Sequence, residues 1–127
     1  MPTPSGEPQS TRLSGTAEAP VDVQHLRRYT LGDQKLEAEI LQLFLLQLPQ
    51  LTAALRSAAT ERDWHMATHS LKGAGRAVGA WRVADLAEAA ERLPFSSGYE
   101  ARETAILSLE EAAGEARGFI DTLDCSR

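Results

Sequence analysis

A histidine and a lysine lie one helical turn apart in the middle of the chain, and together they suit chemistry on a phosphoryl group. Near neutral pH an uncharged imidazole is a nitrogen nucleophile, so His69 is the first candidate for a group that reacts. Lys72 follows three residues later, where a cation on the same helix can balance the charge of a bound phosphate. The pair therefore indicates phosphoryl chemistry on the surface of a helix.

The segment from Trp64 to Val78 is predicted to be the helix that carries this pair. At about 100° per residue, its apolar side chains fall within about 60° of one another, and they are Ala67, Leu71, Ala74 and Val78. The opposite side of the helix gathers His65, His69, Lys72 and Arg76. A histidine kept for packing belongs on the apolar side, so we expect His69 to face water.

Gly73 stands beside the pair and has no side chain. A glycine inside a helix costs about 1 kcal/mol relative to alanine, so its presence suggests a steric requirement, namely the close approach of a second protein. Gly75 adds to that cost for no reason evident in the sequence. Met66, Arg76 and Ala77, with Arg82 further on, are the candidate partner-binding residues around the histidine.

The elements that must position these residues begin after a polar tail. Residues 1–20 are rich in Pro, Ser, Thr, Gly and Glu, and with one large apolar residue they cannot offset the entropy of ordering, so a flexible tail is predicted. Residues 21–124 are expected to form one helical bundle, and residues 125–127 form the C-terminal end. No signal peptide or membrane span is evident, so the chain is expected to be soluble.

Two helices are predicted ahead of the histidine helix. A short one runs to Tyr29 with Asp22 as its cap, and a long one follows a second cap, Asp33. Pro49 is expected to kink the long helix or divide it. The long helix carries an apolar stripe with the three- and four-residue steps of a core-facing helix: Leu36, Ile40, Leu43, Phe44, Leu48, Leu51 and Leu55. Leu41, Leu45 and Leu46 are expected to widen this stripe.

The histidine helix and two later helices complete the prediction. Asp63 is expected to cap the histidine helix and Gly79 to end it, after which a helix runs from Ala80 to about Leu93. A turn at residues 94–98 leads to a last helix over residues 99–123, with a buried side formed by Ile106, Leu109, Ala113, Ala116 and Ile120. The fold predicted is all-α, an up-and-down antiparallel four-helix bundle with a short extra N-terminal helix.

The residues around the histidine resemble the signature of the histidine phosphotransfer (HPt) domain family. The resemblance lies in HSLKGA at residues 69–74, followed by VGA at residues 78–80, and it extends less strictly over residues 21–123. It implies that His69 receives a phosphoryl group from a receiver-domain aspartate or a hybrid histidine kinase and passes it to a response regulator. It also assigns phosphate stabilisation to Lys72 and clearance for the partner to Gly73.

The same resemblance implies a phosphocarrier without an ATP site rather than an enzyme. It implies no cofactor in this chain, with Mg²⁺ expected in the partner receiver domain, and it favours a monomer. The net charge of −5 does not support binding to nucleic acid or to an anionic membrane. The single cysteine, Cys125, permits no internal disulfide and fits a reducing cytoplasm.

Four alternatives stay open or are weakened by the sequence. A non-phosphorylated HPt-like adaptor is the main one. A dimerising histidine kinase fragment is disfavoured, because the histidine precedes Leu-Lys-Gly and the chain has no room for an ATP-binding domain. A metal site is not expected, because His65 and His69 are four residues apart but lack the HExxH glutamate and an obvious third ligand. The leucine-rich stretch could also form a dimer interface.

Overall fold

The computed structural model describes residues 19–126, with side chains described up to residue 123. This part of the chain is all-helical and contains no strand. The predicted tail, residues 1–20, lies outside the described residues except for its last two, as does the C-terminal end except for helix backbone. The elements are α2 (Val23–Thr30), α3 (Gln34–Ser57), α4 (Glu61–Val78), α5 (Trp81–Arg92), the 3-10 turn η1 (Phe95–Ser97) and α6 (Tyr99–Ser126).

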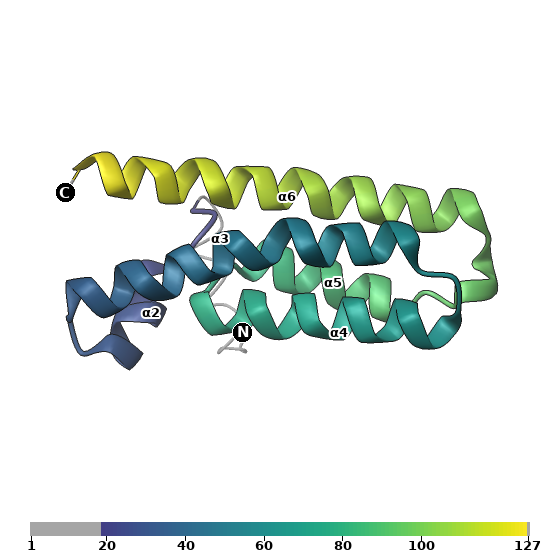
Figure 1. Cartoon of the computed structure of the whole chain (residues 1–127), viewed down its shortest axis with the longest axis horizontal. Helices are drawn as coiled ribbons and strands as arrows, with labels where there is room; N and C mark the ends of the chain where they lie inside the picture. The colour runs from purple at the N-terminus through teal and green to yellow at the C-terminus, as the bar shows by residue number, and fades with distance from the viewer. Residues whose placement is uncertain (1–18, 127) are drawn as a thin grey trace, which may run out of the picture.

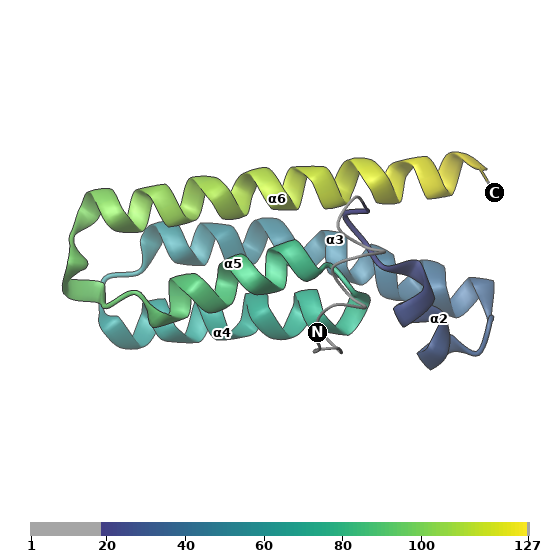
Figure 2. The same ribbon diagram turned by 180° about the vertical axis from the view of Figure 1, so that it is seen from behind.

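The four longer helices form an antiparallel bundle. Contacts run in a ring from α3 to α4 to α5 to α6 and back to α3, and the chain reverses direction at each connection (Figure 1). Seen from behind, α5 lies between α4 and α6 (Figure 2). The short α2 packs against α3 and α4 at the end of the bundle where α3 begins. The predicted up-and-down four-helix bundle with an extra N-terminal helix is confirmed.

Most helix boundaries follow from side-chain capping. Asp22 and Asp33 cap α2 and α3 as predicted, each accepting a hydrogen bond from a backbone N–H three residues later. Gly79 ends α4 with a φ of +82°, the left-handed conformation that glycine adopts without strain. The prediction that Asp63 caps α4 is wrong. Thr60 is the cap, because its extended backbone lets its hydroxyl accept the Asp63 N–H, and the helix begins at Glu61.

Pro49 does not divide α3, which runs through it as a single helix. Proline has no backbone N–H, so the carbonyl of Leu45, four residues earlier, loses its usual helical donor. Arg117 of α6 supplies another donor, because its Nη2 lies 3.1 Å from that carbonyl oxygen. Of the kink or division predicted at Pro49, the division does not occur, because a side chain of α6 satisfies the backbone group that proline leaves unpaired.

The apolar stripe of α3 is rotated from the predicted one. Phe44, Leu48 and Leu55 are buried as predicted, but Leu36 and Leu43 are exposed. Of the residues expected to widen the stripe, Leu41 and Leu45 are buried and Leu46 is exposed. The carboxylate-bearing Glu37 is buried in addition. Glu37 accepts a hydrogen bond from Arg27 of α2 at 3.0 Å, so the approach of α2 explains why a charged residue is covered there.

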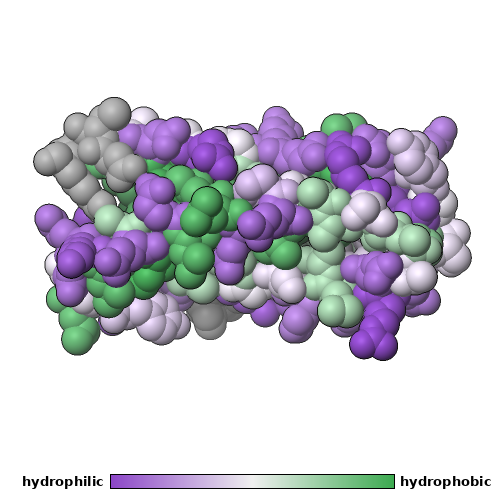
Figure 3. Space-filling model, in the orientation of Figure 1, coloured by the Kyte–Doolittle hydropathy of each residue, from purple (hydrophilic) through white to green (hydrophobic). Residues whose placement is uncertain are grey.

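The apolar composition of α3 leaves hydrophobic side chains on the surface. The space-filling view shows hydrophobic surface gathered over the N-terminal half of α3 (Figure 3), where Leu36, Leu43 and Leu46 are exposed. By length and composition alone, α3 is also long and apolar enough to cross a membrane. Its inner face, however, contributes Leu41, Phe44 and Leu48 to the bundle core, which accounts for much of this apolar character.

The buried side of α6 agrees with the prediction at four of five positions. Ile106, Leu109, Ala116 and Ile120 are buried, whereas Ala113 is partly exposed and Ala112 is buried instead. Phe95 anchors the connection before α6 to the core, because its ring lies edge-on to that of the buried Trp64, with 6.5 Å between the ring centroids. Thus α5 packs directly against α4, and α6 packs against α5.

Candidate functional site

Small residues let α4 and α5 approach closely. A Cβ on Gly75 would lie 3.0 Å from both the carbonyl oxygen of Ala80 and the backbone nitrogen of Ala84, so only glycine fits without a shift. The buried indole of Trp64 donates from Nε1 to the Ala90 carbonyl at 2.8 Å, which ties the start of α4 to the end of α5. The role of Gly75 that the sequence left unassigned is therefore helix packing.

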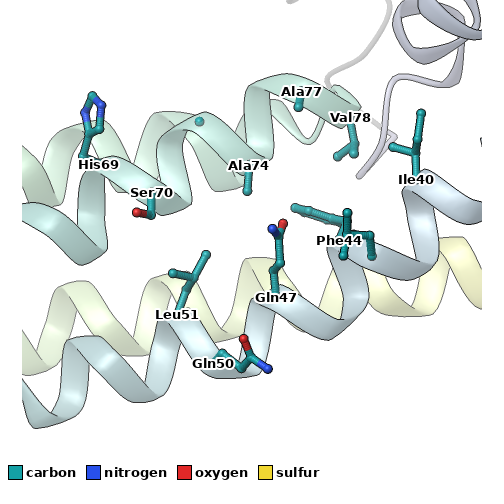
Figure 4. Close-up of a pocket in the computed structure, with 12 residues that line it drawn as sticks. Ile40, Phe44, Gln47, Gln50, Leu51, His69, Ser70, Ala74, Ala77 and Val78 are labelled. Carbon is teal, nitrogen blue, oxygen red and sulfur yellow. The ribbon is translucent and has the colours of Figure 1, made fainter.

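His69 projects from the middle of α4 into solvent, as expected. Its side chain is 67% exposed, and its ring points away from α3 (Figure 4). The ring of His65, one turn earlier, stacks on it with 6.0 Å between centroids and 14° between planes. An exposed imidazole on a rigid helix is open to a reactant carried by another protein.

Glu91 of α5 reaches across to this histidine. Its Oε2 lies 3.3 Å from His69 Nδ1 and 3.6 Å from His65 Nε2. A carboxylate can only accept, so the contact with His69 is a hydrogen bond when Nδ1 carries the proton. In that tautomer Nε2 has the lone pair, and a nucleophile is available at the outer edge of the ring.

Lys72 pairs with the same glutamate rather than projecting freely with His69. Its Nζ donates to Glu91 Oε1 at 2.6 Å, and its side chain is only 17% exposed. This hydrogen bond is the main reason that the pKa of Glu91 lies below its usual value, while burial acts in the opposite direction. The carboxylate is thus held charged between a lysine and a histidine. Lys72 lies between the two faces of α4 rather than fully on the water-facing side.

Sequence reasoning missed Glu91 because its partners lie 19 and 22 residues away on another helix. A local signal exists, however. Ala84 and Ala87 are buried against α4, and Glu91 follows them at the helical steps of three and four residues. A glutamate that continues an alanine stripe is an unusual choice for a packed face, unless it meets a polar partner there.

The three side chains also form a set that could hold a metal ion. One ligand atom from each of His65, His69 and Glu91 lies within 4.8 Å of the other two. The expectation that the two histidines lack a third ligand is corrected here, because the fold supplies one from α5.

A groove of about 600 Å³ lies between α3 and α4, with His69 at its rim (Figure 4). The α4 side of the groove includes Ser70, Gly73, Ala74 and Ala77. A Cβ on Gly73 would meet no atom within 4 Å, so nothing inside this chain requires glycine there. The bundle's own packing therefore does not explain why the surface beside His69 is left open at Gly73.

The other predicted partner-binding residues are divided between two sides of α4. Ala77 lines the groove, and the exposed Met66 lines a second hollow that shares Ser70 and Leu51 with it. Arg76 instead faces α5, where its Nη2 lies 3.6 Å from Glu88. Arg82 hydrogen-bonds Glu115 of α6 at 2.7 Å. The structure brings Met66 and Ala77 onto the groove side of His69 and places the arginines apart from them.

Comparison with known proteins agrees with this geometry. A family model described as "Hpt domain" matches residues 39–119, which run from α3 through α4 and α5 into α6. No curated protein and no solved structure gives a significant match. The matched segment covers more than half of the chain and contains His69, Lys72, Gly73 and Glu91. The chain therefore belongs to the Hpt domain family.

Proposed function

We propose that this protein carries a phosphoryl group on Nε2 of His69 between receiver-domain aspartates, or from a hybrid histidine kinase to a response regulator. Membership of the Hpt family gives it a phosphotransfer role in a phosphorelay. The observation that supports the specific assignment is the hydrogen bond from His69 Nδ1 to Glu91, which directs the lone pair of an exposed ring to Nε2. The protein acts as a carrier, and it needs no ATP site for this role.

The transfer step balances with the groups present and a receiver. The Nε2 lone pair attacks phosphorus as the bond to the receiver's aspartyl oxygen breaks, and the electron pair leaves with that carboxylate. The ring becomes positively charged while Nδ1–H stays hydrogen-bonded to Glu91, so the carboxylate stabilises the charge that develops. The receiver supplies Mg²⁺ and its own aspartate, and Lys72 is proposed to stabilise the phosphate from one turn away.

The docking surface is proposed to be the groove side of α4. Gly73 offers no side chain to an approaching receiver, and Met66 and Ala77 flank it with exposed apolar atoms. Arg76 is proposed to reach an acidic receiver surface at the edge of this contact. Family membership indicates an intracellular location, and we propose that the chain acts as a cytoplasmic monomer.

Substitution of the acceptor tests the proposal directly. His69→Gln should abolish acid-labile, base-stable labelling by a panel of phosphorylated receiver domains, while helical content by circular dichroism stays unchanged because the side chain is exposed. His65→Gln is the matched control, since it removes the neighbouring histidine from the same face. Persistent labelling of His69→Gln would refute the assignment, and receiver binding without transfer in the wild type would favour an adaptor.

A further inference from the structure

Two exposed histidines and a glutamate converge on one point at the α4–α5 interface. His65 and His69 are one turn apart on α4, and Glu91 Oε2 lies 3.6 Å from Nε2 of the first and 3.3 Å from Nδ1 of the second. Phosphoryl transfer through His69 gives no role to His65. The stacked arrangement of the two rings nevertheless aims one nitrogen of each at the same carboxylate oxygen.

We propose that His65, His69 and Glu91 bind Zn²⁺, and that the bound ion switches off phosphoryl acceptance at His69. Zinc takes imidazole nitrogen and carboxylate oxygen ligands at about 2.0–2.2 Å, so ligand atoms of a tetrahedral site lie roughly 3.3 Å apart. The distances from Glu91 Oε2 to the two ring nitrogens fall close to this separation. All three ligand atoms lie within 4.8 Å of one another, and rotation of the exposed histidine side chains would bring them to three of the four positions.

The surroundings of the cluster suit this kind of ion. Lys72 holds the other carboxylate oxygen, Oε1, at 2.6 Å, so Oε2 stays directed at the histidines. The two histidine side chains are 60% and 67% exposed, which leaves room for water at the fourth position. Mg²⁺ prefers oxygen ligands in octahedral geometry, so the Mg²⁺ that a receiver needs should not compete for this site.

The proposed switch follows from the tautomers of imidazole. With Nδ1 protonated against Glu91, the lone pair that attacks phosphorus is on Nε2. Zinc at Nδ1 binds through a lone pair on that atom, so the single ring proton must move to Nε2 through solvent. A protonated Nε2 has no lone pair to form the phosphorus–nitrogen bond. Zinc binding and phosphoryl acceptance therefore exclude each other at the same ring.

Zinc binding by the isolated protein tests the site without a receiver. Titration against a chromophoric zinc indicator should show one ion per chain in the wild type. Loss of a residue that hydrogen-bonds a metal ligand lowers metal affinity by roughly 10–100-fold. Loss of a ligand itself in His65→Gln should therefore lower zinc affinity by at least about tenfold. His25→Gln is the matched control because His25 lies on α2, outside the cluster. Equal affinity in the wild type and His65→Gln would overturn the proposal.

Nuclear magnetic resonance and transfer assays then test the switch. Zinc should shift the ring proton of ¹⁵N-labelled His69 from Nδ1 to Nε2, and a zinc-selective chelator should reverse this. Zinc should also stop receiver-dependent labelling of the wild type but leave His65→Gln labelled as without zinc. Equal inhibition of both proteins, or an unchanged His69 tautomer, would overturn the switch. Failure of all labelling without zinc would count against the phosphocarrier function alone, because the binding and tautomer results do not depend on a receiver.

Discussion

Glu91 contacts three side chains of α4 through its two oxygen atoms, and they are His65, His69 and Lys72. One oxygen accepts from Lys72 and the other faces His69, so the carboxylate sets the tautomer of the histidine while the lysine fixes the carboxylate. Neither Glu91 nor Lys72 needs to touch the reacting phosphorus for this effect. We therefore predict that Glu91 is a positioning residue whose contribution is separable from that of the proposed nucleophile, His69.

Glu91→Ala should therefore slow phosphotransfer and mix the tautomers of His69. A hydrogen bond to a charged group contributes about 1.5–3 kcal/mol, and the exposed 3.3 Å contact belongs at the lower end, so a roughly tenfold slower rate is expected. The ¹⁵N shifts of the ring should change from one tautomer toward an average of two. Glu88→Ala, which removes a neighbouring carboxylate of α5, should leave the tautomer unchanged. An unaltered tautomer in Glu91→Ala would contradict this role.

Gly73 and Gly75 lie two residues apart on α4, and alanine should affect them in opposite directions. A Cβ on Gly73 meets open space, so Gly73→Ala should stabilise the protein by about 0.5–1 kcal/mol through helix propensity. A Cβ on Gly75 meets backbone atoms of Ala80 and Ala84 at 3.0 Å, so Gly75→Ala should destabilise it. Urea denaturation measures both free energies of unfolding.

The functional consequence at Gly73 separates docking from folding. Gly73→Leu should fold with wild-type helical content yet accept phosphate from receivers more slowly, because the side chain would occupy the surface beside His69. Unchanged transfer rates would show that the open surface at Gly73 is not used by the receiver. A destabilised Gly73→Ala would instead show that some internal contact requires the glycine.

For single residues, the sequence predicts exposure and helix ends correctly where the residue's own helix determines them. The exposure of His69 and the end of α4 at Gly79 follow from helical spacing and from the turn that glycine permits. Glu91 and the covered position of Lys72 do not, because both depend on how α5 packs against α4. Contacts between helices are set by the fold and carry only weak local signals.

Pro49 and Arg117 make α3 and α6 dependent on each other. The proline deprives the Leu45 carbonyl of a donor within α3, and the arginine of α6 donates to that carbonyl at 3.1 Å. The helix stays continuous where its own sequence favours a break. A backbone defect on one element is thus compensated by a side chain of another.

A double-mutant cycle measures this compensation. Arg117→Met should destabilise the protein by about 1 kcal/mol, because the Leu45 carbonyl loses its donor. In a Pro49→Ala background the restored N–H of residue 49 can bond that carbonyl, so the same change should cost less. Free energies from urea denaturation of the four proteins give the coupling. Additive costs would mean that the arginine stabilises α3 independently of the proline.

Element-scale prediction succeeds where caps and periodicity are local. Asp22 and Asp33 begin their helices as predicted, and the short connections correctly predict an antiparallel bundle. The buried face of α3 was assigned less well, because its leucines surround the helix and periodicity alone cannot select among them. The helices that pack against α3, namely α2, α4 and α6, determine which of its sides is buried. Glu37, Leu41 and Leu45 are buried, whereas Leu36 and Leu43 remain exposed.

For the whole molecule, the seam between α3 and α6 carries a network of charges. Arg56 of α3 hydrogen-bonds both oxygens of Glu110, each at 2.8 Å, and also reaches Glu103, about two turns earlier on α6. The hydrogen bonds from Arg56 are the main reason that the pKa of Glu110 lies below its usual value, with burial acting in the opposite direction. The seam closes the ring of helices on the side away from Glu91 and α5.

This network should make the stability of the bundle depend on acid. A carboxylate whose pKa is lower in the folded state than in the unfolded state stabilises the fold above its unfolded value, about 4.3 for glutamate. That contribution is lost as the pH falls through the lower, folded-state pKa. Glu110→Gln should therefore unfold at lower urea than the wild type at pH 7, and the gap should narrow as the pH falls below about 4. Glu111→Gln is the matched control. The side chain of Glu111 is 68% exposed, and its oxygen lies 4.0 Å from Arg82, a longer and weaker contact than those of Glu110 with Arg56. If the gap between Glu110→Gln and wild type stayed constant down to pH 3, the α3–α6 seam would be held by packing of Leu48, Leu109 and their neighbours rather than by the Arg56 pair.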